Sequence, residues 1–130
     1  MEAIGWIGTV ALECPDPAAL AHFYSRLTGR PVVFAGPDWY SLADDSGGVS
    51  LSFQLAPGHQ PPVWPDPASS MQFHLHVKVG GDLDAAERAV VAIGATRFAE
   101  QPSPQDFRVL ADPAGHPFCL VPASRPTPPN

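Results

Sequence analysis

The chain has 130 residues, of which 45% are hydrophobic and 15% charged, and this favours one folded domain over a charge-driven disordered chain. Its 7 Lys and Arg against 13 Asp and Glu give a net charge of −6, the wrong sign for holding nucleic-acid phosphates. No apolar run approaches the ~18 residues of a membrane span and the N-terminus does not resemble a signal peptide, so we expect a cytoplasmic protein with no nucleic-acid or membrane partner.

The first half of the sequence predicts a strand, a helix and three short strands, in that order. Apolar and polar residues alternate over 6–14, which is typical of a strand with one buried face. Asp16 and Pro17 then supply a helix cap and a first-turn proline, an apolar stripe follows at helical spacing, and Gly29 stands where that helix would end. The remaining strands are predicted over 31–35, 39–43 and 49–55, the last two joined by a turn at 44–48.

The second half predicts the same series of elements. It comprises a strand over 72–79, a helix from Asp82 to Gly94, and strands over 96–100, 107–111 and 117–121. A shift of 65 positions also brings Phe53 onto Phe118 and Gly29 onto Gly94, so the sequence indicates two related halves.

The connection between the halves is rich in proline. Residues 57–70 contain five prolines, which cannot join a strand ladder and favour an extended, stiff linker. The tail over 123–130 is also proline-rich and is predicted to be frayed. We therefore predict a single α+β domain over 1–130, built from two βαβββ modules at about 4–56 and 71–122.

Alternation sorts the strand residues onto two faces. One apolar set is predicted to pack against the helices: Val10, Leu12, Leu51, Phe53, Leu55, Leu75, Val77, Phe118 and Leu120. The opposite set is mixed and polar, and is predicted to line a solvent-connected concave surface: Thr9, Ala11, Glu13, Ser50, Ser52, Gln54, His74, His76, Lys78 and Cys119.

Four motifs carry a family resemblance. They are DPAALAHFY at 16–24, LTG at 27–29, FHLH at 73–76 and DPAGHPFCL at 112–120. In this order, around paired βαβββ modules, they resemble the vicinal oxygen chelate superfamily, specifically its glyoxalase-like or bleomycin-resistance-like group. The resemblance implies curved mixed sheets around a concave cleft, with the helices outside.

The resemblance also implies where a divalent metal would lie. In metal-using members four positions on the concave face hold the ion, usually as His and Glu, and here they correspond to Thr9, Gln54, His74 and Cys119. Only His74 matches, and a hydroxyl and an amide are poor donors to a transition metal. We therefore expect no cofactor. The open alternative is a divalent ion held by His74 with His76, Glu13 or Cys119.

Several residues are candidates for a ligand site, each with a plainer alternative. Trp39 and Trp64 suit an aromatic ligand, although a tryptophan in a proline-rich loop more often anchors that loop. His74, His76 and Glu13 are the candidate acid and base groups. The full predicted ligand set is Thr9, Glu13, Trp39, Ser52, Gln54, Trp64, His74, His76, Lys78 and Cys119.

Two functions remain open at this point. The first is a small-molecule-binding protein that sequesters an antibiotic or metabolite without a complete metal site. The alternative is an enzyme (a lyase, isomerase, dioxygenase or cofactor-free cyclase) that uses His74 and His76 as metal ligands or acid/base groups, so the sequence leaves open whether a reaction is catalysed. The resemblance further implies a homodimer.

Overall fold

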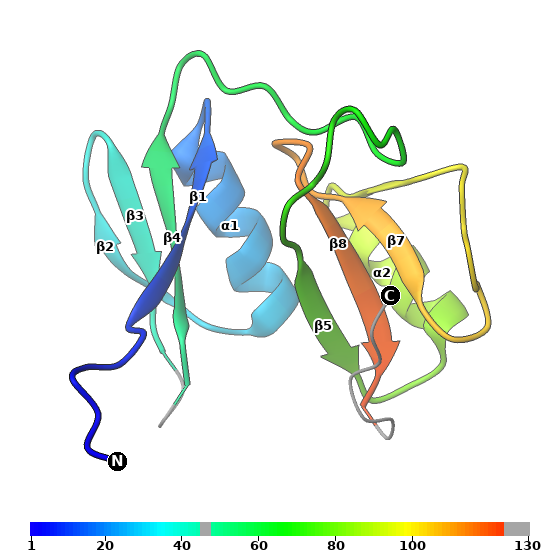
Figure 1. The fold of residues 1–130 in the computed structure, drawn as a ribbon, viewed down its shortest axis with the longest axis horizontal. Coiled ribbons are helices and arrows are strands. Elements are labelled where there is room, and N and C mark those ends of the chain that lie inside the picture. The colour runs from blue at the N-terminus through cyan, green and yellow to red at the C-terminus, as the bar shows by residue number, and fades with distance from the viewer. Residues whose placement is uncertain (45–47, 124–130) are drawn as a thin grey trace. The chain divides into compact units, whose positions relative to one another are not determined.

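The computed structural model describes residues 1–44 and 48–123. The middle of the turn predicted at 44–48, and all but the first residue of the tail predicted over 123–130, lie outside these residues. Contacts divide the chain into two compact units, Met1–His59 and Gln60–Asn130, and each holds one βαβββ series (Figure 1). The predicted α+β class is confirmed.

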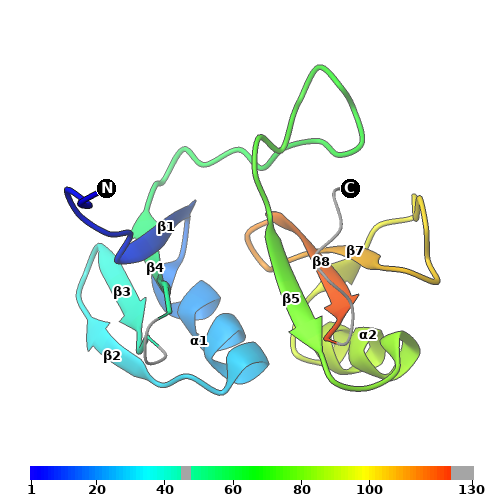
Figure 2. The same cartoon turned by 60° about the horizontal axis from the view of Figure 1, so that its bottom comes forward.

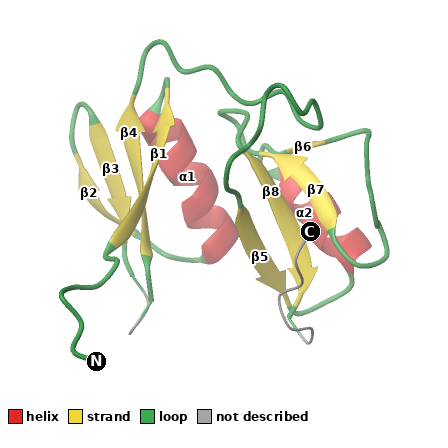
Figure 3. Ribbon diagram, viewed as in Figure 1, coloured by secondary structure: helices red, strands yellow, loops and turns green. Residues whose placement is uncertain are grey.

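The first unit is a four-stranded sheet with one helix. Its elements are β1 (Thr9–Cys14), α1 (Pro17–Thr28), β2 (Val32–Ala35), β3 (Trp39–Leu42) and β4 (Ser50–Leu55). The strand order is β1-β4-β3-β2, with β1 parallel to β4 and the other pairs antiparallel. Helix α1 packs against β3 and β4 on one face (Figure 3), which leaves the other face of the sheet for polar residues.

The second unit repeats this arrangement. Its elements are β5 (Leu75–Val79), α2 (Leu83–Ala92), β6 (Thr96–Arg97), β7 (Arg108–Ala111) and β8 (Pro117–Pro122). The order is β5-β8-β7-β6, again with the outer pair β5 and β8 parallel. Figures 1 and 2 both show α2 along one face of this sheet, and its contacts are with β8 and β6.

The ends of helix α1 follow the local signals in the sequence. The Asp16 carboxylate accepts a hydrogen bond from the Ala19 N–H at 3.1 Å, and Pro17 opens the helix where no N–H is needed. Gly29 adopts φ 76°, and its N–H donates to the Ser25 carbonyl at 2.9 Å. Both predicted ends of the first helix are therefore confirmed.

Each unit has its own apolar core on the helix side of its sheet. In the first unit Tyr24 of α1 stacks on Phe53 of β4 with ring centroids 5.6 Å apart, and both side chains are buried. In the second unit Phe118 and Leu120 of β8 are fully buried. The predicted apolar face is thus the packed face, although five of its members are only half-buried: Val10, Leu51, Leu55, Leu75 and Val77.

Three strands are shorter than predicted by more than one residue, and each has a local cause. Strand β1 begins at Thr9 because its partner β4 begins opposite, at Ser50. Strand β5 begins at Leu75 because Gln72 has φ 61°, which interrupts an extended chain. Strand β6 ends at Arg97 because the Val109 N–H, which a longer strand would pair, donates instead to the Gln101 side chain at 3.0 Å.

The prediction that 57–70 is extended throughout is wrong for residues 63–69. The Asp66 N–H donates to the Val63 carbonyl at 2.8 Å, and the Ser69 N–H donates to the Asp66 carbonyl at 3.0 Å. The Ser69 hydroxyl accepts the Val63 N–H at 2.8 Å and closes the segment into consecutive turns. Aspartate and serine side chains stabilise such turns by bonding nearby backbone groups, an effect that a count of prolines does not reveal.

Candidate functional site

Polar and aromatic residues form rows across the face of the first sheet that lies opposite α1. Strand pairing aligns Glu13 of β1 with Gln54 of β4, and Gln54 with Trp39 of β3. The next row on the same face aligns Ser52 of β4 with Ser41 of β3, and Ser41 with Phe34 of β2. We call this surface the first-sheet polar face, and its members are Thr9, Glu13, Phe34, Trp39, Ser41, Ser52 and Gln54.

A chain of hydrogen bonds runs across this face. The Trp39 indole N–H donates to the Ser41 hydroxyl at 2.8 Å, the Ser41 and Ser52 hydroxyls lie 2.9 Å apart, and those of Ser52 and Thr9 lie 2.7 Å apart. The Thr9 hydroxyl also donates to the Ser50 carbonyl at 3.2 Å. Because an indole N–H can only donate, one direction along the chain satisfies every donor, from Trp39 through to Ser50. This network fixes the orientation of the Trp39 ring.

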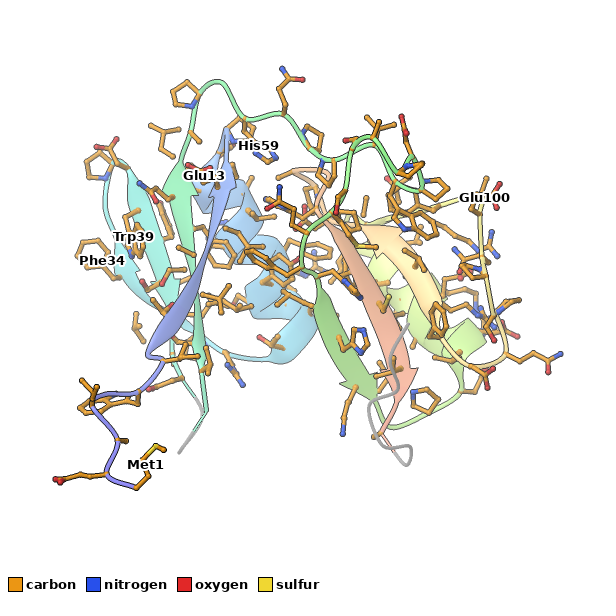
Figure 4. The ribbon with its side chains drawn as sticks, viewed as in Figure 1. Met1, Glu13, Phe34, Trp39, His59 and Glu100 are labelled. Atoms are coloured by element: carbon orange, nitrogen blue, oxygen red, sulfur yellow. The ribbon has the colours of Figure 1, made fainter. Side chains whose placement is uncertain are left out.

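Phe34 and Trp39 give the polar face an aromatic margin. Figure 4 shows both side chains at the side of the sheet formed by β2 and β3, and Phe34 is 56% exposed. The turn between the strands is closed by the Gly36 N–H donating to the Trp39 carbonyl at 2.8 Å. A Cβ on Gly36 would stand 3.0 Å from the Phe34 ring, so glycine lets this ring lie against the turn.

In the second unit, His74, His76 and Cys119 lie together. His76 is the strand partner of Cys119, and the two histidines present their Nε2 atoms 3.1 Å apart. One nitrogen from each ring and the Cys119 sulfur all lie within 4.8 Å of one another. The histidines are half-buried, and Cys119 is only 1% exposed. Two predicted acid/base candidates and the predicted Cys119 therefore form one cluster.

Around Cys119 the outer face of the second sheet is not solvent-connected, contrary to prediction. Cys119 is buried with Val109 and Val121, and Trp64, Phe98 and Phe107 pack against these three. The Trp64 and Phe98 rings meet edge to face at 5.0 Å. Alternation predicted the direction of Cys119 correctly, but the aromatic residues from the loops cover that face as a second apolar layer.

Of the other predicted site residues, three lie on exposed strand surface and two are covered. Glu13 is exposed on β1, Gln54 on β4, and Lys78 on β5 beside Val121. Ser52 is 1% exposed and is held within the hydroxyl network. Trp64 packs against the cysteine layer.

Two of the four positions implied for a divalent metal, Thr9 and Gln54, lie in the first unit, and they do not fit a shared ion. Thr9 is paired with Ser50, so it lies four residues away from Gln54 along adjacent strands, roughly 13 Å by strand rise. A threonine hydroxyl and a glutamine amide are also weak donors for a transition metal. Their separation and their chemistry both argue against a shared ion.

The two sheets also differ in register. Residues of β1 pair with residues 41 positions later, as Thr9 does with Ser50, whereas residues of β5 pair with residues 43 positions later, as Leu75 does with Phe118. A single shift of 65 positions therefore cannot superpose both strand pairs. The 65-position shift matches residues that share a face of the sheet, but it does not match residues that lie at the same level along the paired strands.

Sequence reasoning missed two members of the first-sheet polar face. Ser41 stands two residues after Trp39 in a predicted strand, so alternation alone would have placed both on one face. Phe34 joins the face through the pairing of β2 with β3, which is irregular between Val32 and Phe34. Because a bulge changes which residues share a face, the position of Phe34 had no reliable signal.

Comparison with known proteins gives a consistent result. The family model described as a glyoxalase-like domain matches residues 9–121. A search of the curated proteins found no match. Within residues 1–44 and 48–123, neither helix is long and apolar enough to cross a membrane.

Similar crystal structures have low sequence identity to this chain. A glyoxalase/bleomycin resistance protein/dioxygenase family enzyme from Burkholderia phytofirmans has a TM-score of 0.65 at 20% identity, covering 87% of this chain and 94% of that chain. A fosfomycin resistance protein from Listeria monocytogenes has a TM-score of 0.68 at 13% identity, covering 94% and 96%. The bleomycin-binding protein of Streptomyces verticillus, in complex with copper(II)-bleomycin, has a TM-score of 0.55 at 17% identity, covering 94% and 100%. At these identities the likeness is one of fold.

Proposed function

Because this chain belongs to the glyoxalase-like domain family, within the vicinal oxygen chelate superfamily, we propose that it is a small-molecule-binding protein whose ligand occupies the first-sheet polar face. The observation that carries the proposal is the row of Glu13, Gln54 and Trp39 across three adjacent strands. It combines a carboxylate, an amide and an indole on rigid elements, and a few polar groups beside an aromatic surface are typical of ligand sites.

The chemistry of the face favours a flat ligand that carries a positive charge. Trp39 and Phe34 offer aromatic surface, and an indole attracts cations as well as flat rings. Glu13 supplies a negative charge on the same face, and the whole chain has a net charge of −6, which attracts cations and repels anions. We therefore propose an aromatic cation as the ligand class, held without a metal ion.

One neighbour binds a small molecule and another is a resistance protein, and this supports the class of function. One is described as bleomycin-binding and the other as a fosfomycin resistance protein. We propose that the present chain sequesters a small molecule of the proposed class, an aromatic cation. The charge of the first-sheet polar face distinguishes it from a site built for an anion.

Calorimetric titration with matched probes tests the proposal. Proflavine serves as the planar aromatic cation, 1-anilinonaphthalene-8-sulfonate as the aromatic anion, and copper(II)-bleomycin as a third probe. We expect proflavine to bind more tightly than the anion, and Trp39→Phe, Phe34→Ala and Glu13→Gln each to weaken it about 10-fold. The control is Val91→Ala, which shortens an exposed apolar side chain on α2. Equal affinity for cation and anion, or no effect of the three substitutions, would contradict the proposal.

An enzyme remains the second candidate, because the Nε2 atoms of the His74 and His76 imidazoles lie 3.1 Å apart. A neutral imidazole can accept a proton from a substrate while its neighbour donates one. This candidate predicts that His74→Ala abolishes turnover of a substrate while the circular dichroism spectrum is unchanged. Turnover that survives in both His74→Ala and His76→Ala would eliminate it.

We also propose that the protein acts as a homodimer, as the family resemblance implies. Light scattering coupled to size-exclusion chromatography should then give a mass close to twice the 13.8 kDa of one chain. A mass of one chain at all concentrations tested would refute this.

A further inference from the structure

We propose that residues 1–8, which we call the N-terminal arm, close over the first-sheet polar face when a ligand binds there. In this closed state Trp6 covers the side of the ligand that faces away from Trp39. The inference rests on the proposed function, because it gives the aromatic cation on that face a second aromatic contact. The arm and the face both belong to the first unit.

The N-terminal arm presents apolar side chains to solvent. Ile4, Trp6 and Ile7 are 108%, 92% and 72% exposed, and Figure 1 shows the arm running clear of the sheet from the start of β1. Single exposed apolar residues are common on protein surfaces, but three of them within one short segment form a concentrated apolar surface. Covering that surface with a flat apolar molecule is favourable, because it removes apolar area from water.

The base of the arm is anchored beside the hydroxyl network of the first-sheet polar face. The Gly8 carbonyl accepts hydrogen bonds from the Ser50 N–H at 3.1 Å and from the Ser50 hydroxyl at 3.2 Å. The next side chain, Thr9, belongs to the network that ends at the Trp39 indole N–H. The arm therefore starts directly at the face on which the ligand is proposed to bind.

The arm is long enough to bring Trp6 over a ligand that is stacked on Trp39. The Thr9 hydroxyl and the Trp39 indole nitrogen lie within about 8.4 Å of each other, the combined length of hydrogen bonds of 2.7, 2.9 and 2.8 Å. Trp6 stands three residues before Thr9, and three extended residues span up to about 10 Å. A flat ring between two indoles separates them by about 7 Å, which is two van der Waals contacts. Gly8 supplies the backbone freedom that the arm needs to fold back, so closure requires no rearrangement of the sheet.

The charge of the arm matches the proposed ligand class. Residues 1–8 contain one carboxylate, that of Glu2, and no lysine or arginine. Closure brings this second negative group, in addition to Glu13, towards a bound cation. The face of an indole ring also attracts cations, so Trp6 favours an aromatic cation over an aromatic anion. The arm therefore adds to the selectivity of the site as well as to its affinity.

The indole N–H signals of the three tryptophans test the closure directly. Each tryptophan gives one such signal in a proton–nitrogen correlation NMR spectrum, and the spectrum of Trp6→Phe identifies the signal of Trp6. Titration of the isotope-labelled full chain with proflavine should shift the signals of Trp6 and Trp39, because a ring stacked on an indole changes the magnetic field at its N–H. The signal of Trp64, which packs in the second unit, should not shift.

Calorimetric titration measures the contribution of the arm to affinity. Trp6→Ala should weaken proflavine binding about 3- to 10-fold, the range expected for one aromatic stacking contact. The matched control is Phe73→Ala, which removes an exposed aromatic side chain from the second unit and should leave the proflavine affinity unchanged. Circular dichroism checks that both variants are folded.

The outcomes separate the closure of the arm from the proposed ligand site. A shift of the Trp39 signal alone, with equal proflavine affinity in wild type and Trp6→Ala, would overturn the closure and leave the first-sheet polar face as the ligand site. No shift of either signal would overturn both proposals. A Trp6 signal that moves with protein concentration but not with proflavine would also overturn the closure, because the arm would then contact a second copy of the chain.

Discussion

Truncating Trp64 should destabilise the second unit, because this side chain closes the apolar layer over Cys119. Trp64 packs against the cluster of Val109, Cys119 and Val121 and meets Phe98 edge to face at 5.0 Å. A partly buried indole cut to alanine loses about 100 Å² of apolar contact, worth about 2.5 kcal/mol, and the ring pair adds about 0.5–1.5 kcal/mol. We therefore expect Trp64→Ala to lower the free energy of unfolding by about 3 kcal/mol.

Urea denaturation followed by circular dichroism measures this loss, and thermal melting should show a fall in Tm of about 10 °C for a chain of this length. Trp6→Ala is the control, because Trp6 is 92% exposed and its loss should change the free energy of unfolding by less than about 0.5 kcal/mol. If Trp64→Ala costs no more than Trp6→Ala, Trp64 does not hold the proline-rich segment on the sheet.

Two further substitutions test the packing and the ion pairs of the second unit. Gly115→Ala should lower the free energy of unfolding, measured by urea denaturation, by about 2 kcal/mol or more. Gly115 has φ 91°, and a Cβ there would lie 2.6 Å from the Pro61 side chain. The control is Gly80→Ala, because a Cβ on Gly80 would meet nothing within 4 Å. Arg108→Gln should cost about 1 kcal/mol by the same assay, because the Arg108 guanidinium bonds Asp84 at 2.8 Å. Hydrogen bonding to the Asp84 carboxylate raises the pKa of Arg108, so the cation's contribution is complete below its ordinary pKa and is lost only in strong alkali. Arg108→Gln should therefore lower the free energy of unfolding by the same amount at pH 6 and at pH 9. An effect that becomes smaller as the pH rises from 6 to 9 would contradict this account.

The helices and the identity of the strands could be predicted because their signals are local. Asp16, Pro17 and Gly29 fix the ends of α1 through bonds that span no more than four residues. Alternation likewise assigned the Leu12 and Phe53 side chains to the packed face, and both are buried.

Features that depend on distant partners could not be predicted in the same way. The burial of Cys119 requires Trp64, Phe98 and Phe107 to fold over it from two loops, and no short-range pattern announces that. The placement of His76 beside Cys119 depends on the register of β5 and β8. Alternation gave the shared face of His74, His76 and Cys119, but only the pairing brings His76 level with the sulfur.

The difference of two residues between the registers of the two sheets restricts how the halves can be exchanged. A chimera that replaces β8 by the β4 sequence at the 65-position shift would slide each side chain by one full pleat relative to β5, about 6.6 Å along the strand. Because two is an even number, inward residues would still point inward, and the graft would keep its apolar layer. An insertion of a single residue would instead turn every side chain of the strand to the wrong side, so the fold tolerates a two-residue slide far better than a one-residue slide.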